Sequence, residues 1–332
     1  MKSHVLSFGV ALAVVLSIGL PNAQAPANVD SLVSAAKIAA GLEWPGTFLR
    51  LCIVPAPAPA PSGSAPAAAP PGSPPKDSWY AEPAKVADNF YFLGTKFHSA
   101  WALVGSGGII IIDTLYEYAA GDEIINGMKT LGLDGRNVRY VIISHAHADH
   151  DGGAKLLQDT FPSAHLIYGG PDWDTVDKAA THAGGKPKRD TVGADGMKVS
   201  VGDASVQIVT TPGHTPGTLS FLFDVKDQGM PLRVAYVGGT AIPFNGDADY
   251  YDTYIGSVRK MARLAADFGA TALLSNHTEF DNAYYKAHTA ANRQRGDGNP
   301  FDVGRAAVGR YFTMVEECAT AAKLRAASIV PR

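Results

Sequence analysis

Short runs of apolar, β-branched and aromatic residues recur along the chain, separated by polar or glycine-rich segments. Such runs between turn-forming residues are typical of β-strands. The pattern predicts strands at residues 89–93, 100–104, 108–112, 138–143, 165–168, 198–201, 205–209, 219–223, 233–237 and 272–275. These strands form two similar halves of the chain.

Segments with helical spacing of apolar residues lie among the strands. Helices are predicted at residues 30–40, 123–131, 251–268 and 302–327. Asp30 or Ser31 is expected to cap the first helix, and a glycine follows each of the first three. Strand clusters interleaved with helices predict an α/β fold in which sheets pack together and helices cover the outside.

Composition excludes some partners. The 332 residues are 46% hydrophobic and 18% charged, as in ordinary globular proteins. The formal net charge is −3 and no basic block is present, which argues against nucleic acid as a partner. A small-molecule substrate is the expected partner, and nothing in the sequence indicates an oligomeric state.

The N-terminus has the pattern of a secretory signal. Lys2 precedes an apolar run at residues 5–20, and Ala23-Gln24-Ala25 matches a cleavage site. We therefore expect residues 1–25 to be a signal peptide and the protein to be periplasmic or secreted. The run is short for a membrane span and no comparable stretch follows, although an uncleaved anchor is the alternative interpretation.

The rest of the chain divides by composition. Residues 26–54 are predicted to form an N-terminal arm with a short helix, and residues 55–76 a Pro/Ala-rich linker, since from 55 to 75 every residue is Pro, Ala, Ser or Gly. Residues 77–332 are predicted to form a single catalytic domain. Cys52 and Cys318 are the only cysteines, and export favours a disulfide between them over two unrelated buried thiols.

The sequence HAHADH at residues 145–150 directly follows the predicted strand 138–143. Residues two apart in an extended segment point the same way, so His145 and His147 can bind one ion together. Asp149 and His150 follow as the chain turns into a helix and are displaced enough to serve a second ion. Imidazole and carboxylate are the usual ligands of zinc besides thiolate.

Two further histidines follow predicted strands. His214 lies in the turn TPGHTPGT after strand 205–209, and His277 follows strand 272–275. A single histidine at a strand end is more often structural. Together with HAHADH, these two complete a set that can hold two metal ions.

These motifs, in this order and context, resemble the metallo-β-lactamase-fold hydrolase superfamily, over residues 78–281. The resemblance implies a four-layer αββα sandwich with two Zn²⁺ at one edge. It assigns one site to His145, His147 and His214, and the other to Asp149, His150 and His277. Asp113, at the end of the strand GIIII, matches an aspartate that orients the ligands from behind.

The predicted strand AYVGGTAIPF, residues 235–244, indicates which subclass of the superfamily the chain resembles. Most members place an aspartate there that bridges the metals, and one lactamase subclass a cysteine, but here the position falls on Gly239 or Thr240. With six His and Asp ligands, the chain is most similar to the third, di-zinc subclass of metallo-β-lactamases. That implies attack on the β-lactam amide by a metal-bound hydroxide, which Asp149 orients.

Substrate contacts are expected at the same strand and in nearby loops. Thr240 replaces one of two serine hydroxyls that usually bind the substrate carboxylate, and Ile242 falls where the other would be, which predicts weak β-lactam hydrolysis. Phe97, His98 and Trp173 are further candidates for the substrate pocket. The alternatives are a hydrolase of the same fold acting on a lactone, thioester or sulfate ester, and a non-enzymatic metal-bearing scaffold.

Overall fold

The structure is a computed structural model that describes residues 28–53, 73–243 and 246–329. The expected signal peptide and most of the expected linker lie outside the described residues. None of the helices described is long and apolar enough to cross a membrane.

The first sheet contains seven strands in chain order. They are β1 (Ala84–Ala87), β2 (Phe90–Phe92), β3 (Trp101–Gly105), β4 (Gly108–Ile112), β5 (Val138–Ile142), β6 (His165–Gly169) and β7 (Thr191–Gly193). Pairing is antiparallel from β1 to β4 and parallel from β4 to β7. Parallel neighbours require crossover connections, so the carboxyl ends of β4, β5 and β6 meet at one edge.

The second sheet contains five strands in the order β12-β11-β10-β9-β8. They are β8 (Lys198–Val201), β9 (Ala204–Thr210), β10 (Leu219–Asp227), β11 (Met230–Val237) and β12 (Ala272–Ser275). The first four form an antiparallel meander, whereas β12 is parallel to β11. The ends of β5, β9 and β12 carry the candidate ligands.

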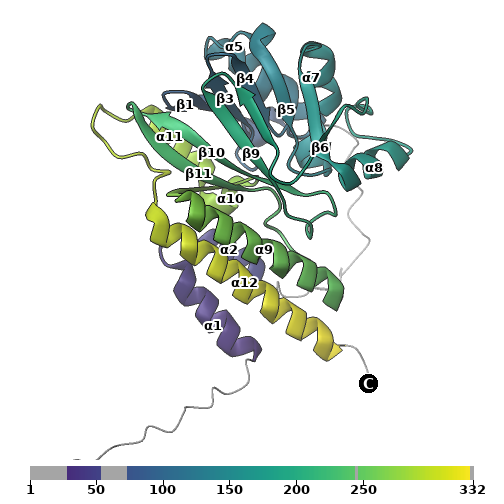
Figure 1. Cartoon of the computed structure of the whole chain (residues 1–332), viewed down its shortest axis with the longest axis vertical. Coiled ribbons are helices and arrows are strands. Elements are labelled where there is room, and N and C mark those ends of the chain that lie inside the picture. The colour runs from purple at the N-terminus through teal and green to yellow at the C-terminus, as the bar shows by residue number, and fades with distance from the viewer. Residues whose placement is uncertain (1–27, 54–72, 244–245, 330–332) are drawn as a thin grey trace, which may run out of the picture.

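Helices cover the outer face of each sheet (Figure 1). On the first sheet lie α4 (Glu117–Ala120), the π-helical turn η1 (Gly121–Asn126), α5 (Gly127–Thr130), α7 (Ala154–Thr160) and α8 (Gly170–Lys178). On the second lie α9 (Ala248–Phe268) and α12 (Gly304–Ile329), and α1 (Val29–Ala40) and α2 (Pro45–Cys52) pack against α12. The remaining short helices are α3 (Lys76–Trp79), η2 (Gly135–Asn137), α6 (Ala148–Asp151), α10 (Thr278–Asp281) and α11 (Ala283–Ala291).

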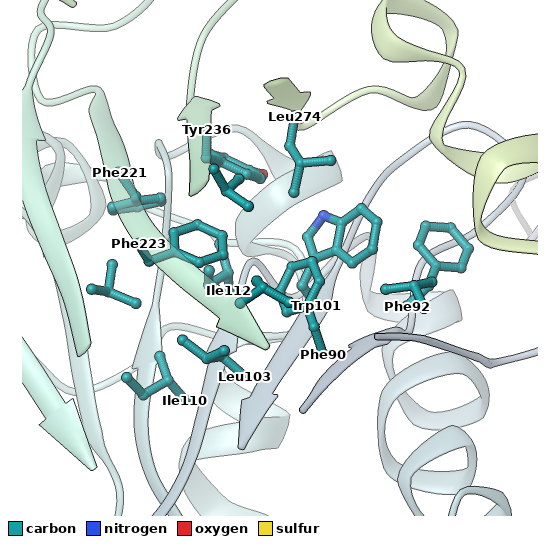
Figure 2. Packing of buried hydrophobic residues seen from close by; sticks show 14 of the residues in the cluster. Phe90, Phe92, Trp101, Leu103, Ile110, Ile112, Phe221, Phe223, Tyr236 and Leu274 are labelled. Atoms are coloured by element: carbon teal, nitrogen blue, oxygen red, sulfur yellow. The ribbon is translucent and has the colours of Figure 1, made fainter. Parts of the chain in front are cut away.

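The main hydrophobic core lies between the two sheets (Figure 2). Strand alternation sends Ile110 and Ile112 of β4 into this core and sends Ile109 and Ile111 toward the outer helices. Trp101 of β3 stacks on a neighbouring phenylalanine with ring centroids 4.7 Å apart. The expected four-layer αββα sandwich is confirmed.

The N-terminal arm packs against the last helix. Cys52 and Cys318 form the expected disulfide, and the indole Nε1 of Trp44 donates to the Ala307 carbonyl at 2.8 Å. Asn28 is the N-cap of α1, because its side chain accepts from the Ser31 amide at 2.9 Å, and the Ser31 hydroxyl completes a capping box by accepting from the Asn28 amide at 3.0 Å. The expected cap was therefore wrong by two to three positions.

Candidate metal centre

All three segments that carry the candidate ligands follow strand ends at the edge where the two sheets meet. His145 lies three residues after β5, His214 lies in the loop after β9, and His277 lies two residues after β12. The Leu219 amide at the start of β10 donates to the Ser144 carbonyl at 2.8 Å, and this bond ties the second sheet to the HAHADH segment. The fold thus brings together segments far apart in sequence.

The first ligand group consists of His145, His147 and His214. Nε2 of His214 lies 3.1 Å from Nε2 of His145 and 3.1 Å from Nδ1 of His147. Two donors bound to one tetrahedral zinc at 2.0–2.1 Å lie about 3.3–3.4 Å apart, so the spacing suits a zinc-sized ion.

Backbone carbonyls fix the orientation of two of these rings. Nδ1 of His145 donates to the Gly238 carbonyl at 2.8 Å, and Nδ1 of His214 donates to the Ala241 carbonyl at 2.6 Å. A carbonyl only accepts, so each Nδ1 carries the proton and each Nε2 presents a lone pair. Two lone pairs that face each other at 3.1 Å repel unless a cation lies between them.

Burial favours the neutral, ligating form of both imidazoles. Burial lowers the pKa of His214 to about 4, and burial together with neighbouring imidazoles places the pKa of His145 well below its ordinary value. His147 is the exposed member of the group. Its side of the group is therefore open to solvent.

The second ligand group is built around the carboxylate of Asp149. Its Oδ2 lies 3.2 Å from Nε2 of His150 and 3.4 Å from Nε2 of His277, and the two imidazole nitrogens are 3.2 Å apart. The three atoms expected at the second site thus have the spacing of ligands to one ion.

Electrostatics at the second group favours a cation. Burial lowers the pKa of His150, but the neighbouring carboxylates of Asp113 and Asp149 outweigh burial and raise it to about 9. Burial raises the pKa of Asp149, yet the imidazoles of His150, His277 and His98 hold it below its usual range. A divalent cation would supply the positive charge that a proton supplies on His150.

Asp113 lies behind the second group, on the side away from Asp149. It is fully buried, and its Oδ2 is 3.4 Å from Nδ1 of His150. The same oxygen accepts hydrogen bonds at 2.8 Å from the hydroxyls of Ser144 and Tyr236. Asp113 therefore holds a fixed anion against the ring of His150, the place expected from the sequence.

A second buried carboxylate, Asp172, was missed by the sequence analysis. Its Oδ2 accepts from the Ala146 amide and the Thr215 hydroxyl, each at 2.8 Å, and its Oδ1 accepts from the Gly217 amide at 2.8 Å. Asp172 thereby joins the HAHADH loop to the loop that carries His214. It belongs to α8, a helix that the sequence pattern did not predict.

Of the two positions where a bridging ligand was expected, Gly239 has no room for a side chain. A Cβ on Gly239 would lie 2.5 Å from the Cβ of His214. An aspartate or cysteine at Gly239 would therefore displace a residue of the first group. At the other position, the hydroxyl of Thr240 is 3.0 Å from that of Ser275 and 2.9 Å from that of Tyr311.

Three of the expected substrate contacts are wrong. Thr240 is buried, with its hydroxyl 3.0 Å from that of Ser275 and 2.9 Å from that of Tyr311. Ile242 is buried in the core between the second sheet and its helices. Trp173 is fully buried, and its indole donates to the Thr191 carbonyl at 2.8 Å. These side chains pack inside the protein, where a substrate does not reach them.

Two other expected contacts lie at the second group. His98 has its Nε2 at 3.5 Å from Oδ2 of Asp149. Phe97 is 48% exposed beside it. Tyr116, which the sequence analysis did not single out, packs edge-on against the ring of His98 at a centroid distance of 5.2 Å.

Comparison with known proteins agrees with this architecture. Residues 93–227 match the Metallo-beta-lactamase superfamily. The crystal structure of BJP-1, a subclass B3 metallo-beta-lactamase of Bradyrhizobium japonicum, superposes with a TM-score of 0.64 at 24% identity, covering 76% of this chain and 97% of that one. At this identity the likeness concerns the fold.

The curated relatives are named as lactonases, unlike the solved structure of a metallo-beta-lactamase. An N-acyl homoserine lactonase of a Bacillus species is 31% identical over 133 residues, which cover 39% of this chain and 50% of the relative. The match thus spans about half the length of that relative. The N-acyl homoserine lactonase AttM of Azorhizobium caulinodans is 28% identical over 196 residues, covering 53% of this chain and 73% of the relative.

Proposed function

We propose that this protein is a zinc-dependent hydrolase that opens the ring of an uncharged lactone, with one zinc ion at each ligand group. Hydrolysis of the β-lactam amide is the second candidate. Both reactions use the same centre to attack a cyclic carbonyl, so the two proposals differ in the groups that surround the substrate.

The burial of Thr240 and Ile242 is the main support for a lactone, rather than a β-lactam, as the substrate. A β-lactam antibiotic presents a carboxylate, which needs a hydroxyl or a cation to bind it. The hydroxyl of Thr240 is already engaged by two partners inside the protein. The charged groups that most affect the pKa of Asp149 are imidazoles, and neither Lys nor Arg is among them.

The relatives support each candidate in a different way. The curated relatives above are N-acyl homoserine lactonases, and a homoserine lactone ring carries no carboxylate. The solved structure above is a metallo-beta-lactamase, but it supports the fold alone. The sequence relatives and the buried hydroxyl therefore agree on the lactone.

Different residues of the chain would have different roles in the reaction. Bound zinc supplies Lewis-acid polarisation of the carbonyl and a lowered pKa for an attacking water. Asp149 directs Oδ2 at the imidazoles, and its Oδ1 accepts no hydrogen bond from the described residues, so Oδ1 can orient that water. The exposed side, at His147, is where substrate would enter.

We also propose that the protein is exported. The disulfide between Cys52 and Cys318 supports this, because disulfides persist in oxidising compartments. The pattern of residues 1–25 is the second support. Detection of the mature N-terminus in a periplasmic or culture fraction is the direct test.

The substrate is tested by comparing kcat/KM of the zinc-loaded protein for an N-acyl homoserine lactone, nitrocefin and a carbapenem. We expect the lactone to be preferred by at least about ten-fold, since one missing charge-assisted hydrogen bond costs roughly 1.5–3 kcal/mol. Asp149→Ala is the inactive control. Preference for the β-lactams would establish the second candidate, and full metal loading with no turnover of any ester, lactone or amide would support a scaffold.

A further inference from the structure

His98 lies in the loop between β2 and β3, far in sequence from the histidines at the ends of β5, β9 and β12. Its side chain is largely buried, at 15% exposed, and its Nε2 is directed at Oδ2 of Asp149. Among the described residues, neither ring nitrogen of His98 makes a hydrogen bond with a backbone group. The imidazole is therefore not committed to holding its own loop together.

Three imidazoles lie at similar distances from the carboxylate of Asp149. Oδ2 of Asp149 lies 3.2 Å from Nε2 of His150, 3.4 Å from that of His277 and 3.5 Å from that of His98. Donor atoms that share one tetrahedral zinc lie about 3.3–3.4 Å apart. His98 is thus about as close to Asp149 as His277 is, and the ligand atoms of His98, Asp149 and His277 all lie within 4.8 Å of one another. The rings of His98 and His150 are farther apart, with centroids at 5.9 Å, so a shared ion would draw His98 closer to His150.

Backbone pairing holds His98 beside His277. The two residues form an isolated antiparallel bridge, and the Ser99 amide donates to the Asn276 carbonyl at 2.9 Å. Residues directly opposite in such a pair send their side chains to the same face. The centroids of the two imidazole rings are 4.9 Å apart.

The loop that carries His98 is itself well anchored. The Thr95 hydroxyl accepts from the amides of Phe97 and His98 at 3.1 and 2.9 Å, and the Thr278 amide donates to the Phe97 carbonyl at 2.9 Å. His98 is thus positioned by the same rigid elements that position His277. A preorganised imidazole costs little entropy when it binds an ion.

We propose that His98 is a fourth protein ligand of the second metal site, together with Asp149, His150 and His277. The inference rests on the metal binding in the proposed function and not on the choice of substrate. Four protein ligands fill a tetrahedral shell, whereas the three imidazoles of the first group leave one position open. The first site would then be the one that receives the substrate carbonyl.

The test uses metal titration of the purified full-length protein. His98→Asn removes the imidazole, and His165→Asn is the matched control, because His165 is an exposed histidine on β6. His98→Phe is a second variant that keeps an aromatic ring against Tyr116 but has no ligand atom. The measurements are zinc stoichiometry, the Kd of each site by chelator competition, and the absorption spectrum of the cobalt-loaded protein.

We expect both His98 variants to weaken the second site by at least about 10–100-fold, the range seen even for groups that only support a ligand. The cobalt spectrum should change, while His165→Asn should match the wild type. Unchanged affinity and an unchanged spectrum, with only KM for the lactone altered, would make His98 a substrate contact and overturn the proposal. A wild type that binds no metal would instead overturn the proposed function.

Discussion

The two ligand groups hold their imidazoles by different means. In the first group, backbone carbonyls of Gly238 and Ala241 accept from the Nδ1 atoms of His145 and His214. In the second, the buried carboxylate of Asp113 faces Nδ1 of His150, and Asp149 adds a second anion among the ligands. The first group is thus neutral and anchored by the backbone, whereas the second is anionic and anchored by side chains.

This difference has a consequence for metal affinity. Anionic ligands attract a divalent cation more strongly than neutral ones, and partial burial weakens the screening by water. The second site should therefore fill first in a zinc titration. It should also be the site that single side-chain substitutions damage most, because the backbone anchors of the first group are not removed by mutation.

The largest expected effect is loss of Asp149. Asp149→Ala removes the carboxylate on which the imidazoles of the second group converge, so the second metal and more than about 100-fold of kcat should be lost. His214→Ala should instead weaken the first site and leave the second one filled. Zinc content and chelator competition for the two variants check this, and equal loss of both metals in each variant would contradict separate sites.

A smaller effect is expected from the anchor behind His150. Asp113→Asn keeps the size of the side chain but removes its charge, so affinity at the second site should fall about 10–100-fold. The first site should change little. Tyr236→Phe is the control, because it deletes one hydrogen bond to Asp113 and leaves the carboxylate. If Asp113→Asn weakened both sites equally, Asp113 would support both metal sites, which would contradict a role at the second site alone.

The sequence could place the candidate ligands at strand ends because strand ends depend on local pattern. Strands β4, β8 and β12 have the predicted bounds, and the ligands follow strand ends whose apolar runs are unmistakable. The superfamily and the four-layer fold are confirmed for the same reason. Each predicted strand and each histidine motif is encoded by a short run of neighbouring residues.

Features that depend on distant packing were not predictable. Helix α8, GPDWDTVDK, has only two large apolar residues, Trp173 and Val176, so its pattern did not indicate that Asp172 would link two ligand loops. Thr240 was expected to face substrate, but Tyr311 of α12, far along the chain, covers its hydroxyl. Thr240 lies after the end of β11 (Met230–Val237), so the strand expected at residues 235–244 is shorter than predicted. Which helix covers this segment cannot be read from the segment alone.

A change outside both ligand groups should leave the zinc affinity of each site unchanged. Replacing Cys52 and Cys318 by Ala removes the link between α2 and α12, which lie on the outer side of the second sheet (Figure 1). Removing a native disulfide typically costs about 2–5 kcal/mol of unfolding free energy. Denaturant unfolding should show this loss, while both zinc affinities stay within about two-fold, since the ligand loops are anchored by bonds that the change does not touch. Loss of one metal would show that the arm supports the centre.

The smallest expected effect on zinc binding concerns Glu123, a buried carboxyl under the helices of the first sheet. Burial raises its pKa to about 8, from an ordinary value of 4.5. The folded state therefore binds a proton that the unfolded state has released between these pH values. Its contribution to stability is complete below pH 4.5 and is lost as the pH rises toward 8, by at most about 1.4 kcal/mol per pH unit.

Glu123→Gln should flatten this dependence, because the amide does not titrate in this range. The unfolding free energy of the metal-free protein, measured between pH 5 and pH 8, should fall less steeply for the variant than for the wild type. Asp122→Asn is the matched control, since burial contributes little at this neighbouring carboxyl, whose pKa is lowered chiefly by Lys76. Zinc affinity at both sites should be the same in all three proteins, because Glu123 accepts from the Ala81 amide and contacts neither ligand group. An equal pH slope in wild type and Glu123→Gln would mean that Glu123 is ionised in the folded protein.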